Sequence, residues 1–468
     1  MQYSVTRFFK HASFTILTVV LAVIVVAGVT TQEKTGGDPS GAGETLVSSD
    51  GLDFPPSPPV PDGALSSRIQ GELDTLVESA VRLELDQTVL KKLGQTNDPR
   101  LAWLLVDLLF FSKQEDRLIF KDVFEELTNT VLSGDNLHDM ADRLIAWDTP
   151  APPGYQSYKT KLYQRIDPRW APFFGDESSD VDWRLVMWGG VLMDDRQDAG
   201  PGQRCFRCIP ALDDPPVTGA AGGAWYDDDR LIFGVVINGE ARAYPKNILQ
   251  VHEMINDSLG GRRFGLPYCT LCGSAQAFYL DNVEGFQPVL RTSGMLARSN
   301  KLMFDLDTMS LIETFSGRAL SGPLQKSGIV LEQASVVTST WGEWKRYHPE
   351  TTIVAGDGGI PGYSYPIDPL GARDDQGPIF PVGDVDPRLA VQELVLGVIA
   401  SNGTPVAFPV GRAVLALQAG EKVELEGIRL ELDGSGVRAF IGDLDASGHE
   451  AFWFGWSQFT PETLVWRR

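Results

Sequence analysis

The sequence predicts an α+β protein with an N-terminal transmembrane helix, a small all-α domain that resembles a helical repeat, and a β-rich domain with a weak internal duplication. Three observations support this class. An uncharged apolar run lies near the N-terminus, helical periodicity follows it, and strand-like segments in the second half occur as two pairs of similar sequences. At 468 residues the chain is long enough for about two or three folded units.

The first element is an apolar segment that predicts a membrane anchor. Residues 12–32 carry no charge, and residues 14–30 are almost wholly apolar. A membrane-spanning helix needs about 20 such residues. Arg7 and Lys10 precede the run and acidic residues dominate after it, which predicts a single-pass protein with its body outside the cytoplasm, in the periplasm or beyond. The alternative is a signal peptide that is cleaved, leaving a secreted protein.

The segment after the apolar run predicts a linker and then helices. Residues 33–64 are rich in Gly, Pro, Ser and Asp, a composition that cannot bury enough apolar surface to fold. Ser66 can cap a helix, and Asp98-Pro99 is a second helix-start pattern. Apolar residues recur at helical spacing behind both, which predicts a helical packing domain over residues 65–148 that carries no chemistry.

The second half predicts strands and a repeat. Asn238-Gly239 separates two strand-like runs and supplies the positive φ angles that a two-residue hairpin needs. Residues 231–245 resemble residues 394–409, and residues 341–354 resemble residues 452–466. The predicted parts are 1–32, cytoplasmic stub and transmembrane anchor; 33–64, disordered linker; 65–148, helical domain; 149–230, irregular wrap rich in Trp and Pro; 231–360, β-rich lobe 1; 361–392, connecting segment; and 393–468, β-rich lobe 2.

Charge and motif content exclude two classes of function. The net charge of −22 would repel nucleic acid, so no nucleic-acid partner is expected. The sequence contains neither a P-loop nor a G-x-G-x-x-G pattern between a strand and a helix, so no nucleotide cofactor is expected. The predicted transmembrane helix is the one membrane contact expected. Composition identifies neither a protein partner nor a substrate.

The four cysteines form two CxxC pairs and are the candidate site. Cys205 and Cys208 lie in the predicted wrap, and Cys269 and Cys272 lie in lobe 1. Two thiolates at this spacing, joined by the imidazole of His252, would supply three ligands of a tetrahedral Zn²⁺ or a soft Cu site. The fourth ligand could be water, a nearby carboxylate or a thiolate of the first pair. We therefore predict metal binding by these five residues.

Two other interpretations of the cysteines stay open. A CxxC pair can also exchange disulfides, which would make the protein a thiol–disulfide oxidoreductase. Alternatively, outside the cytoplasm, the pairs can be oxidised and simply brace loops of a scaffold or interaction protein. The sequence does not decide between an enzyme and a binding protein.

Several long motifs resemble the DUF3179 family. They are RAYPKNILQVHEMINDSLGG, PYCTLCGSAQAF, the segment RTSGMLARSNKLMFDLDTMSLIETFSGRALSGPL, and TWGEWKRYHPET, in the family's order and within about residues 180–468. The family has no assigned function and its members are typically exported or membrane-attached, so the resemblance implies that location and no particular activity. It gives weight, without a role, to six motif positions, namely His252, Glu253, Asn256, Asp257, Cys269 and Cys272. Thr270 stands where family members often have Pro.

Overall fold

The structure is a computed structural model that describes residues 46–132, 138–281, 283–371, 373 and 376–468. The predicted transmembrane segment, residues 12–32, lies outside these residues. Among the helices that the structure does describe, none is both long and apolar enough to cross a membrane. The predicted transmembrane helix and the single-pass localisation are therefore corrected, because the structure supports neither.

The predicted fold class is also wrong in its β part. The described strands form five sheets of four to six strands, like the blades of a five-bladed β-propeller in number, and not two lobes. Three strands come from the predicted irregular wrap, namely β1 (Val186–Trp188), β2 (Leu212–Asp213) and β3 (Val217–Gly219). Strands of two or three residues are too short to show the alternation by which strands are recognised in a sequence.

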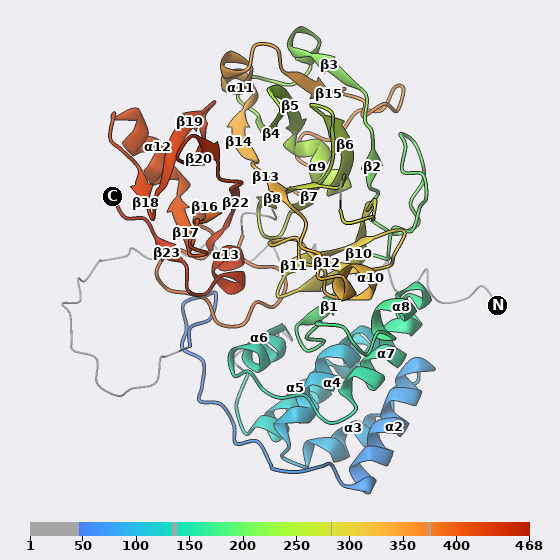
Figure 1. The fold of residues 1–468 in the computed structure, drawn as a ribbon. Coiled ribbons are helices and arrows are strands. Elements are labelled where there is room, and N and C mark those ends of the chain that lie inside the picture. The colour runs from blue at the N-terminus through green and yellow to red at the C-terminus, as the bar shows by residue number, and fades with distance from the viewer. Residues whose placement is uncertain (1–45, 133–137, 282, 372, 374–375) are drawn as a thin grey trace. The chain divides into compact units, whose positions relative to one another are not determined.

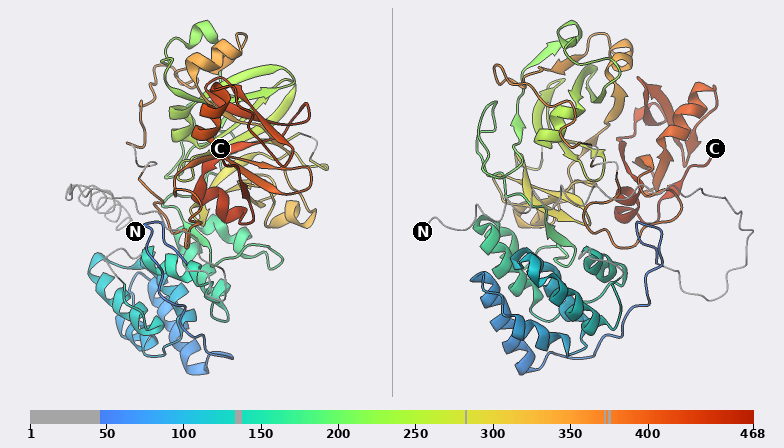
Figure 2. Two further views of the ribbon diagram at one scale, coloured as in Figure 1. Left: turned by 90° about the vertical axis from the view of Figure 1, so that its left-hand side faces the viewer. Right: turned by 180° about the vertical axis from the view of Figure 1, so that it is seen from behind.

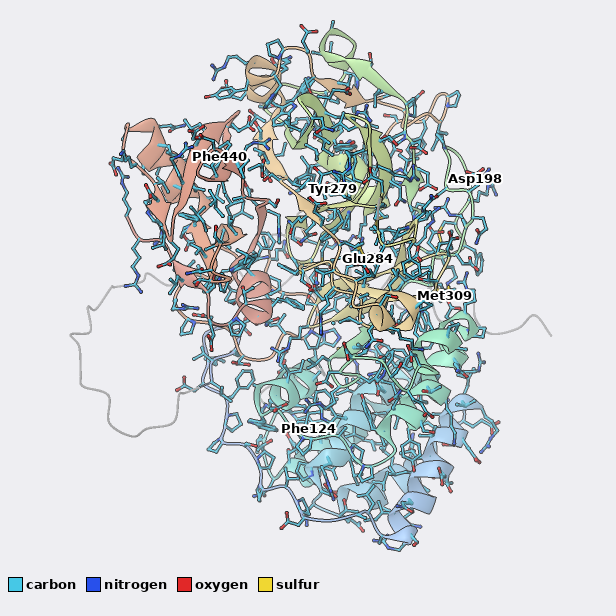
Figure 3. All side chains as sticks on the ribbon, viewed as in Figure 1. Phe124, Asp198, Tyr279, Glu284, Met309 and Phe440 are labelled. Atoms are coloured by element: carbon cyan, nitrogen blue, oxygen red, sulfur yellow. A yellow bond between two sulfur atoms is a disulfide. The ribbon has the colours of Figure 1, made fainter. Side chains whose placement is uncertain are left out.

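Seven helices of the described chain precede the sheets (Figure 1). They are α2 (Ser67–Val81), α3 (Gln87–Gly94), α4 (Ala102–Leu108), α5 (Arg117–Thr128), α6 (His138–Ala146), α7 (Tyr155–Ile166) and α8 (Ala171–Phe174). Their apolar faces share one hydrophobic core, which includes Phe124 and extends to Val186 of β1 and to Phe304 in the same sheet as β1. Figure 3 shows Phe124 among the helices and Tyr279 among the sheets. The helices are thus packed onto the β part through a continuous apolar core.

The sheet that the helices contact has the order β1-β10-β11-β12, and it appears below the other sheets in Figure 1. Its other strands are β10 (Leu290–Ala297), β11 (Asn300–Asp305) and β12 (Leu311–Glu313). The indole of Trp170 donates a hydrogen bond to the backbone oxygen of Ser293 on β10 at 2.8 Å. This contact ties the end of the helical segment directly to the sheet.

Two further sheets correspond to the two similar pairs of sequences. The first-repeat sheet has the order β14-β4-β5-β15, with β3 added at one edge, and the second-repeat sheet has the order β22-β16-β17-β23. In both, the first three strands are antiparallel and the fourth pairs parallel to the third. The strands are β14 (Val337–Thr340), β4 (Leu231–Ile237), β5 (Glu240–Pro245), β15 (Thr352–Val354), β22 (His449–Phe452), β16 (Leu394–Ile399), β17 (Pro405–Pro409) and β23 (Leu464–Val465).

Each repeat continues into a helix and then a hairpin, and the two hairpins belong to the last two sheets. Figure 2 draws the second repeat in red. In the first repeat these are α9 (Lys246–His252), β6 (Met254–Leu259) and β7 (Arg262–Cys269). In the second they are α12 (Val410–Gln418), β19 (Ile428–Asp433) and β20 (Gly436–Ile441). The remaining elements are β8 (Ser274–Ala275), β9 (Ala277–Tyr279), α10 (Gly322–Lys326), β13 (Gln333–Ala334), α11 (Trp341–Tyr347), β18 (Glu424–Leu425), β21 (Leu444–Asp445) and α13 (Trp453–Phe459).

A tryptophan lies against a glycine at the same place in both repeats. The pairs are Gly234 with Trp344 and Gly397 with Trp456, and a Cβ atom on either glycine would overlap the indole ring. Each indole N–H donates to a threonine hydroxyl, Thr351 at 2.9 Å and Thr463 at 3.0 Å. The glycines are therefore required by close packing, and the W-x(6)-T spacing explains why the two sequence segments resemble each other.

Candidate functional site: two cysteine pairs

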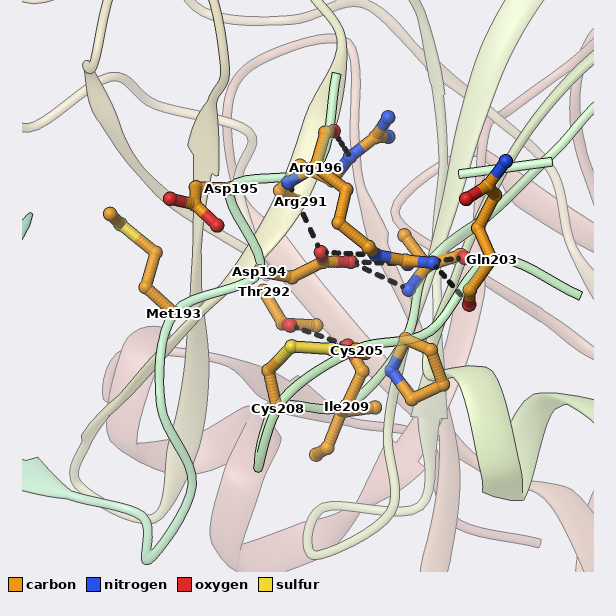
Figure 4. The surroundings of a disulfide bond; sticks show 12 residues. Met193, Asp194, Asp195, Arg196, Gln203, Cys205, Cys208, Ile209, Arg291 and Thr292 are labelled. Atoms are coloured by element: carbon orange, nitrogen blue, oxygen red, sulfur yellow. Dashed lines mark hydrogen bonds and ion pairs between the residues drawn. A yellow bond between two sulfur atoms is a disulfide. The ribbon is translucent and has the colours of Figure 1, made fainter. Parts of the chain in front are cut away.

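The first cysteine pair is oxidised and partly exposed. Cys205 and Cys208 lie in the loop between β1 and β2 and form a disulfide, with Cα atoms 5.5 Å apart (Figure 4). The backbone of Cys208 forms a parallel bridge with Leu192, which holds the loop beside the residues that follow β1. One of these residues is Asp194. A carboxylate oxygen of Asp194 and the two sulfur atoms all lie within 4.8 Å of one another.

Asp194 and the first pair could hold a metal ion once the disulfide is reduced. The carboxylate, however, is already fully engaged. Arg196 donates Nε to Oδ1 at 2.6 Å and Nη2 to Oδ2 at 2.7 Å, and the backbone N–H of Ala211 donates to Oδ2 at 2.9 Å. A metal ion at this position would have to compete with the Arg196 guanidinium for the same oxygen atoms.

The second pair consists of two buried free thiols. Cys269 is the last residue of β7, and a turn places Cys272 so that its N–H donates to the Cys269 carbonyl at 3.3 Å. Gly273 has a φ of +59°, and a Cβ there would come within 2.9 Å of the Phe452 ring. Both thiols point at the carbonyl oxygen of Ser299, with sulfur–oxygen distances of 3.8 Å for Cys269 and 3.5 Å for Cys272. The two sulfur atoms therefore occupy one small volume.

The two buried thiols have unequal acidity. Burial tends to raise the pKa of Cys269, but the hydrogen bond from the Cys272 thiol and the nearby Lys301 together lower that pKa below its usual range. Burial raises the pKa of Cys272 well above its usual range, and a negative charge on Cys269 raises it further. Cys269 is thus the thiol that ionises first, and Cys272 stays protonated beside it.

Cys269 borders a cavity of about 130 Å³, and Cys272 is not among the residues that line it. The Glu253 and Lys301 side chains line the same cavity and form an ion pair of 2.9 Å. Lys301 Nζ also donates to the backbone oxygen of Glu253 at 2.6 Å, and the Thr270 hydroxyl donates to Oε1 of Glu253 at 3.0 Å. Ile209, which follows Cys208 in the chain, forms another part of the wall. The loops of both cysteine pairs therefore reach this cavity.

His252 is close to both regions, but its ring nitrogen atoms are occupied. Nδ1 donates to the Pro210 carbonyl at 2.7 Å, so Nε2 accepts the Tyr365 hydroxyl at 2.6 Å. Burial lowers the pKa of His252 to about 4, so the ring is neutral at pH 7. Across the described residues, His252 joins neither cysteine pair in a group whose ligand atoms all lie within 4.8 Å. Its hydrogen bonds are those of a packed core histidine.

Two residues of the site, Lys301 and Asp194, were not predicted from the sequence. Lys301 lies on β11 and meets the residue after α9, 48 positions away. Asp194 lies in an acidic stretch, LMDDRQD, that looks like an ordinary solvated loop. The one available indication was the arrangement D-x-R at 194–196, in which an aspartate and an arginine two residues later form a bidentate ion pair.

The fold and the cysteines define a β-rich protein with one disulfide and one buried dithiol on neighbouring loops. Residues 207–426 match the family model described as "Protein of unknown function (DUF3179)". The match of this region supports membership of the DUF3179 family, as the motifs indicated. No curated protein and no solved structure matches the chain. The geometry and chemistry of the site are therefore the basis for a function.

Proposed function

We propose that the protein is a thiol–disulfide oxidoreductase whose reactive pair is Cys269 and Cys272. The observation that carries the proposal is the asymmetry of the pair. Cys269 borders a cavity beside a buried lysine, whereas Cys272 is enclosed behind it. A nucleophilic cysteine needs access and a nearby positive charge, and a resolving cysteine needs only contact with the first sulfur.

The reaction requires a disulfide as oxidant, and the two cysteines supply both electrons. The Cys269 thiolate attacks one sulfur of the substrate disulfide, and the other sulfur leaves as a thiolate that takes up a proton. Cys272 then loses its proton and attacks the Cys269 sulfur, forming the Cys269–Cys272 disulfide and releasing the second substrate thiol. One disulfide is thus reduced and one is formed, with no net change in atoms or electrons. A cavity of about 130 Å³ admits a small or extended disulfide only.

The test is to treat the folded protein with oxidised glutathione and follow each cysteine by mass spectrometry. We expect wild-type protein to form the Cys269–Cys272 disulfide, and Cys272→Ser to trap glutathione on Cys269. The double variant Cys205→Ser, Cys208→Ser is the matched control and should react like wild type at the second pair. The proposal fails if both buried thiols stay unmodified in folded protein but react once it is unfolded in urea; the cysteines would then be structural only.

Metal binding is the second candidate, favoured by the proximity of Asp194 to Cys205 and Cys208. Zn²⁺ and Cu(I) are the ions that two thiolates would select. After reduction with a phosphine, the protein should bind one equivalent of added Zn²⁺ or Cu(I), and Cys205→Ser should abolish this binding. Asp194→Asn should weaken it without abolishing it. If the reduced protein elutes from a desalting column without metal, the Arg196 contact has excluded the ion.

A further inference from the structure

A second, larger cavity lies among the helix-contacting sheet, the second-repeat sheet and α13. We call it the His449 cavity. Its volume is about 550 Å³, within the range of about 300–1,000 Å³ that small-molecule sites occupy. Its wall includes Leu302 of β11, Glu313 of β12, Val398 of β16, and His449 of β22. Neither the family assignment nor the proposed thiol chemistry gives this cavity a role.

Aromatic rings form one wall of the His449 cavity. Phe315 and Phe459 stack with ring centroids 4.8 Å apart and planes 9° apart. The imidazole of His449 meets Phe315 edge-on at 5.5 Å and Trp456 edge-on at 5.6 Å. Since each ring is held by another, the wall is preorganised for a flat apolar group, as small-molecule sites usually are.

His449 gives this apolar wall one free polar atom. The residue is only 2 % exposed. Its Nδ1 contacts the side-chain nitrogen of Gln333 at 2.7 Å, whereas its Nε2 has no hydrogen-bond partner. Because the Gln333 amide donates to Nδ1, the proton of the neutral ring lies on Nε2. An unpaired N–H at the wall of a cavity is costly unless a ligand or water accepts from it.

The lining also contains the ionisable residues Asp182, Glu313 and Arg318. Asp182 pairs with Arg184 at 2.6 Å, and Glu313 has its oxygen atoms already paired. Oε1 accepts from the Asn300 side chain at 3.1 Å, and Oε2 accepts from the hydroxyl and the backbone N–H of Ser316 at 2.6 and 2.9 Å. Burial raises the pKa of Glu313. Arg318, which also lines the cavity, pairs with Asp180 at 3.6 Å and has a half-exposed side chain. A buried carboxyl group disfavours an anionic ligand, so the wall suits a neutral molecule.

The fold itself does not require a histidine at this position. His449 pairs with Gly397 on β16, and the residue at the same register in the first repeat is Val337, which pairs with Gly234 on β4. Val337 is fully buried in an ordinary apolar core. The same sheet is therefore built with a valine in one repeat and with an incompletely paired imidazole in the other.

We infer that the His449 cavity binds a neutral aromatic small molecule that carries a hydrogen-bond acceptor, with the acceptor on His449 Nε2–H and the ring against Phe315 and Trp456. The carrying observation is the coincidence of a preorganised aromatic wall with a buried, unpaired donor that the equivalent position of the other repeat lacks. This inference is independent of the cysteine chemistry.

The test uses three probes of similar shape and isothermal titration calorimetry. They are 2-acetylnaphthalene, which has a neutral acceptor; 2-isopropylnaphthalene, which lacks it; and 2-naphthoate, which is an anion. The ratio of acetyl to isopropyl affinity should be about 5-fold higher for wild type than for His449→Phe, because one hydrogen bond is worth about that factor. The anion should bind more weakly than 2-acetylnaphthalene. His348→Phe, which changes a histidine outside the cavity, is the matched control and should leave the ratio unchanged.

A second measurement guards against a variant that does not fold. In wild-type protein with ¹⁵N-labelled histidine, 2-acetylnaphthalene should shift the Nε2 resonance of His449 and 2-isopropylnaphthalene should shift it less. Failure of all three probes to bind wild type overturns the inference. So does an acetyl-to-isopropyl ratio that is the same in wild type and His449→Phe, because the imidazole would then make no contribution to selection.

Discussion

The two repeats share a scaffold and differ in what they carry on it. Both sheets have the same strand order and the same mixture of antiparallel and parallel pairs, and both place a tryptophan against a central glycine. Both continue into a helix and a hairpin. The scaffold is therefore fixed by backbone pairing and by packing of the tryptophan, which leaves turns and single core positions free to diverge.

The turn after the hairpin is one difference between the repeats, and it bears directly on the cysteines. In the first repeat, Cys269 pairs with Ser274 and four residues lie between them. In the second repeat, Ile441 pairs with Leu444 and only two residues lie between them. The longer turn contains Cys272 and Gly273, so the dithiol arises from a local extension of a hairpin that both repeats share. The second repeat instead carries His449 in place of a buried valine.

The largest effect should come from breaking the shared scaffold itself. Trp344→Ala and Trp456→Ala each remove a buried indole and should each lower the free energy of unfolding by about 3–5 kcal/mol. Trp225→Ala, at a tryptophan that is 38 % exposed, is the control and should cost about 1 kcal/mol or less. Urea unfolding measures all three. If Trp456→Ala lowers the free energy of unfolding as little as the control does, the second repeat is not stabilised by its tryptophan as the first repeat is.

His449→Val makes the second repeat like the first and should have a smaller effect. Between pH 7 and pH 5, wild type should lose about 2 kcal/mol of unfolding free energy that the variant does not lose. Burial lowers the pKa of His449 to about 3, whereas the unfolded value is about 6.5. Between these values the unfolded state binds more protons. The contribution of the neutral imidazole to the free energy of unfolding is therefore complete above pH 6.5, and it is lost progressively as the pH falls toward 3.

The measurement is the difference in unfolding free energy between His449→Val and wild type at pH 7 and at pH 5. We expect it to move in favour of the variant as the pH falls. Burial raises the pKa of the adjacent Glu450 to about 8. Both proteins contain Glu450, so their difference reports mainly His449. A difference that does not change with pH would mean that the imidazole is not buried in its neutral form.

Local features of the fold could be predicted from the sequence, because they depend on neighbouring residues. Asn238 and Gly239 have φ angles of +50° and +82°, which confirms the predicted two-residue hairpin turn. The side chains of Ser66 and Asp98 accept backbone N–H groups at helix starts, which confirms both predicted caps. Helix and hairpin starts are decided within about four residues, and sequence patterns report them directly.

The site and the number of sheets could not be predicted in the same way, because they depend on contacts between distant segments. Short strands such as β2 form only because β6 offers a partner edge. The electrostatic environment of Cys269 depends on Lys301, which no local pattern connects to the cysteine. The sequence predicts His252 as a ligand beside the cysteines, yet the folded chain directs its ring to Pro210 and Tyr365.

The smallest expected effect tests whether the longer turn is chemically active, and it changes charge without touching either sulfur. Lys301→Gln removes the cation beside Cys269 and should slow its alkylation by iodoacetamide at pH 7, whereas Glu253→Gln removes the opposing anion and should speed it. Each change should be within about 10-fold, which corresponds to about 1.4 kcal/mol. Thr270→Val, which removes only the Thr270 hydroxyl that donates to Glu253, is the matched control.

If the alkylation rates of the two charge variants change in opposite directions, the reactivity of the Cys269 thiolate is set by the nearby charges, because loss of packing would alter both rates in the same direction. Equal rates in all four proteins would make the first-repeat turn as inert as its counterpart in the second repeat, and the dithiol would then be a structural element only.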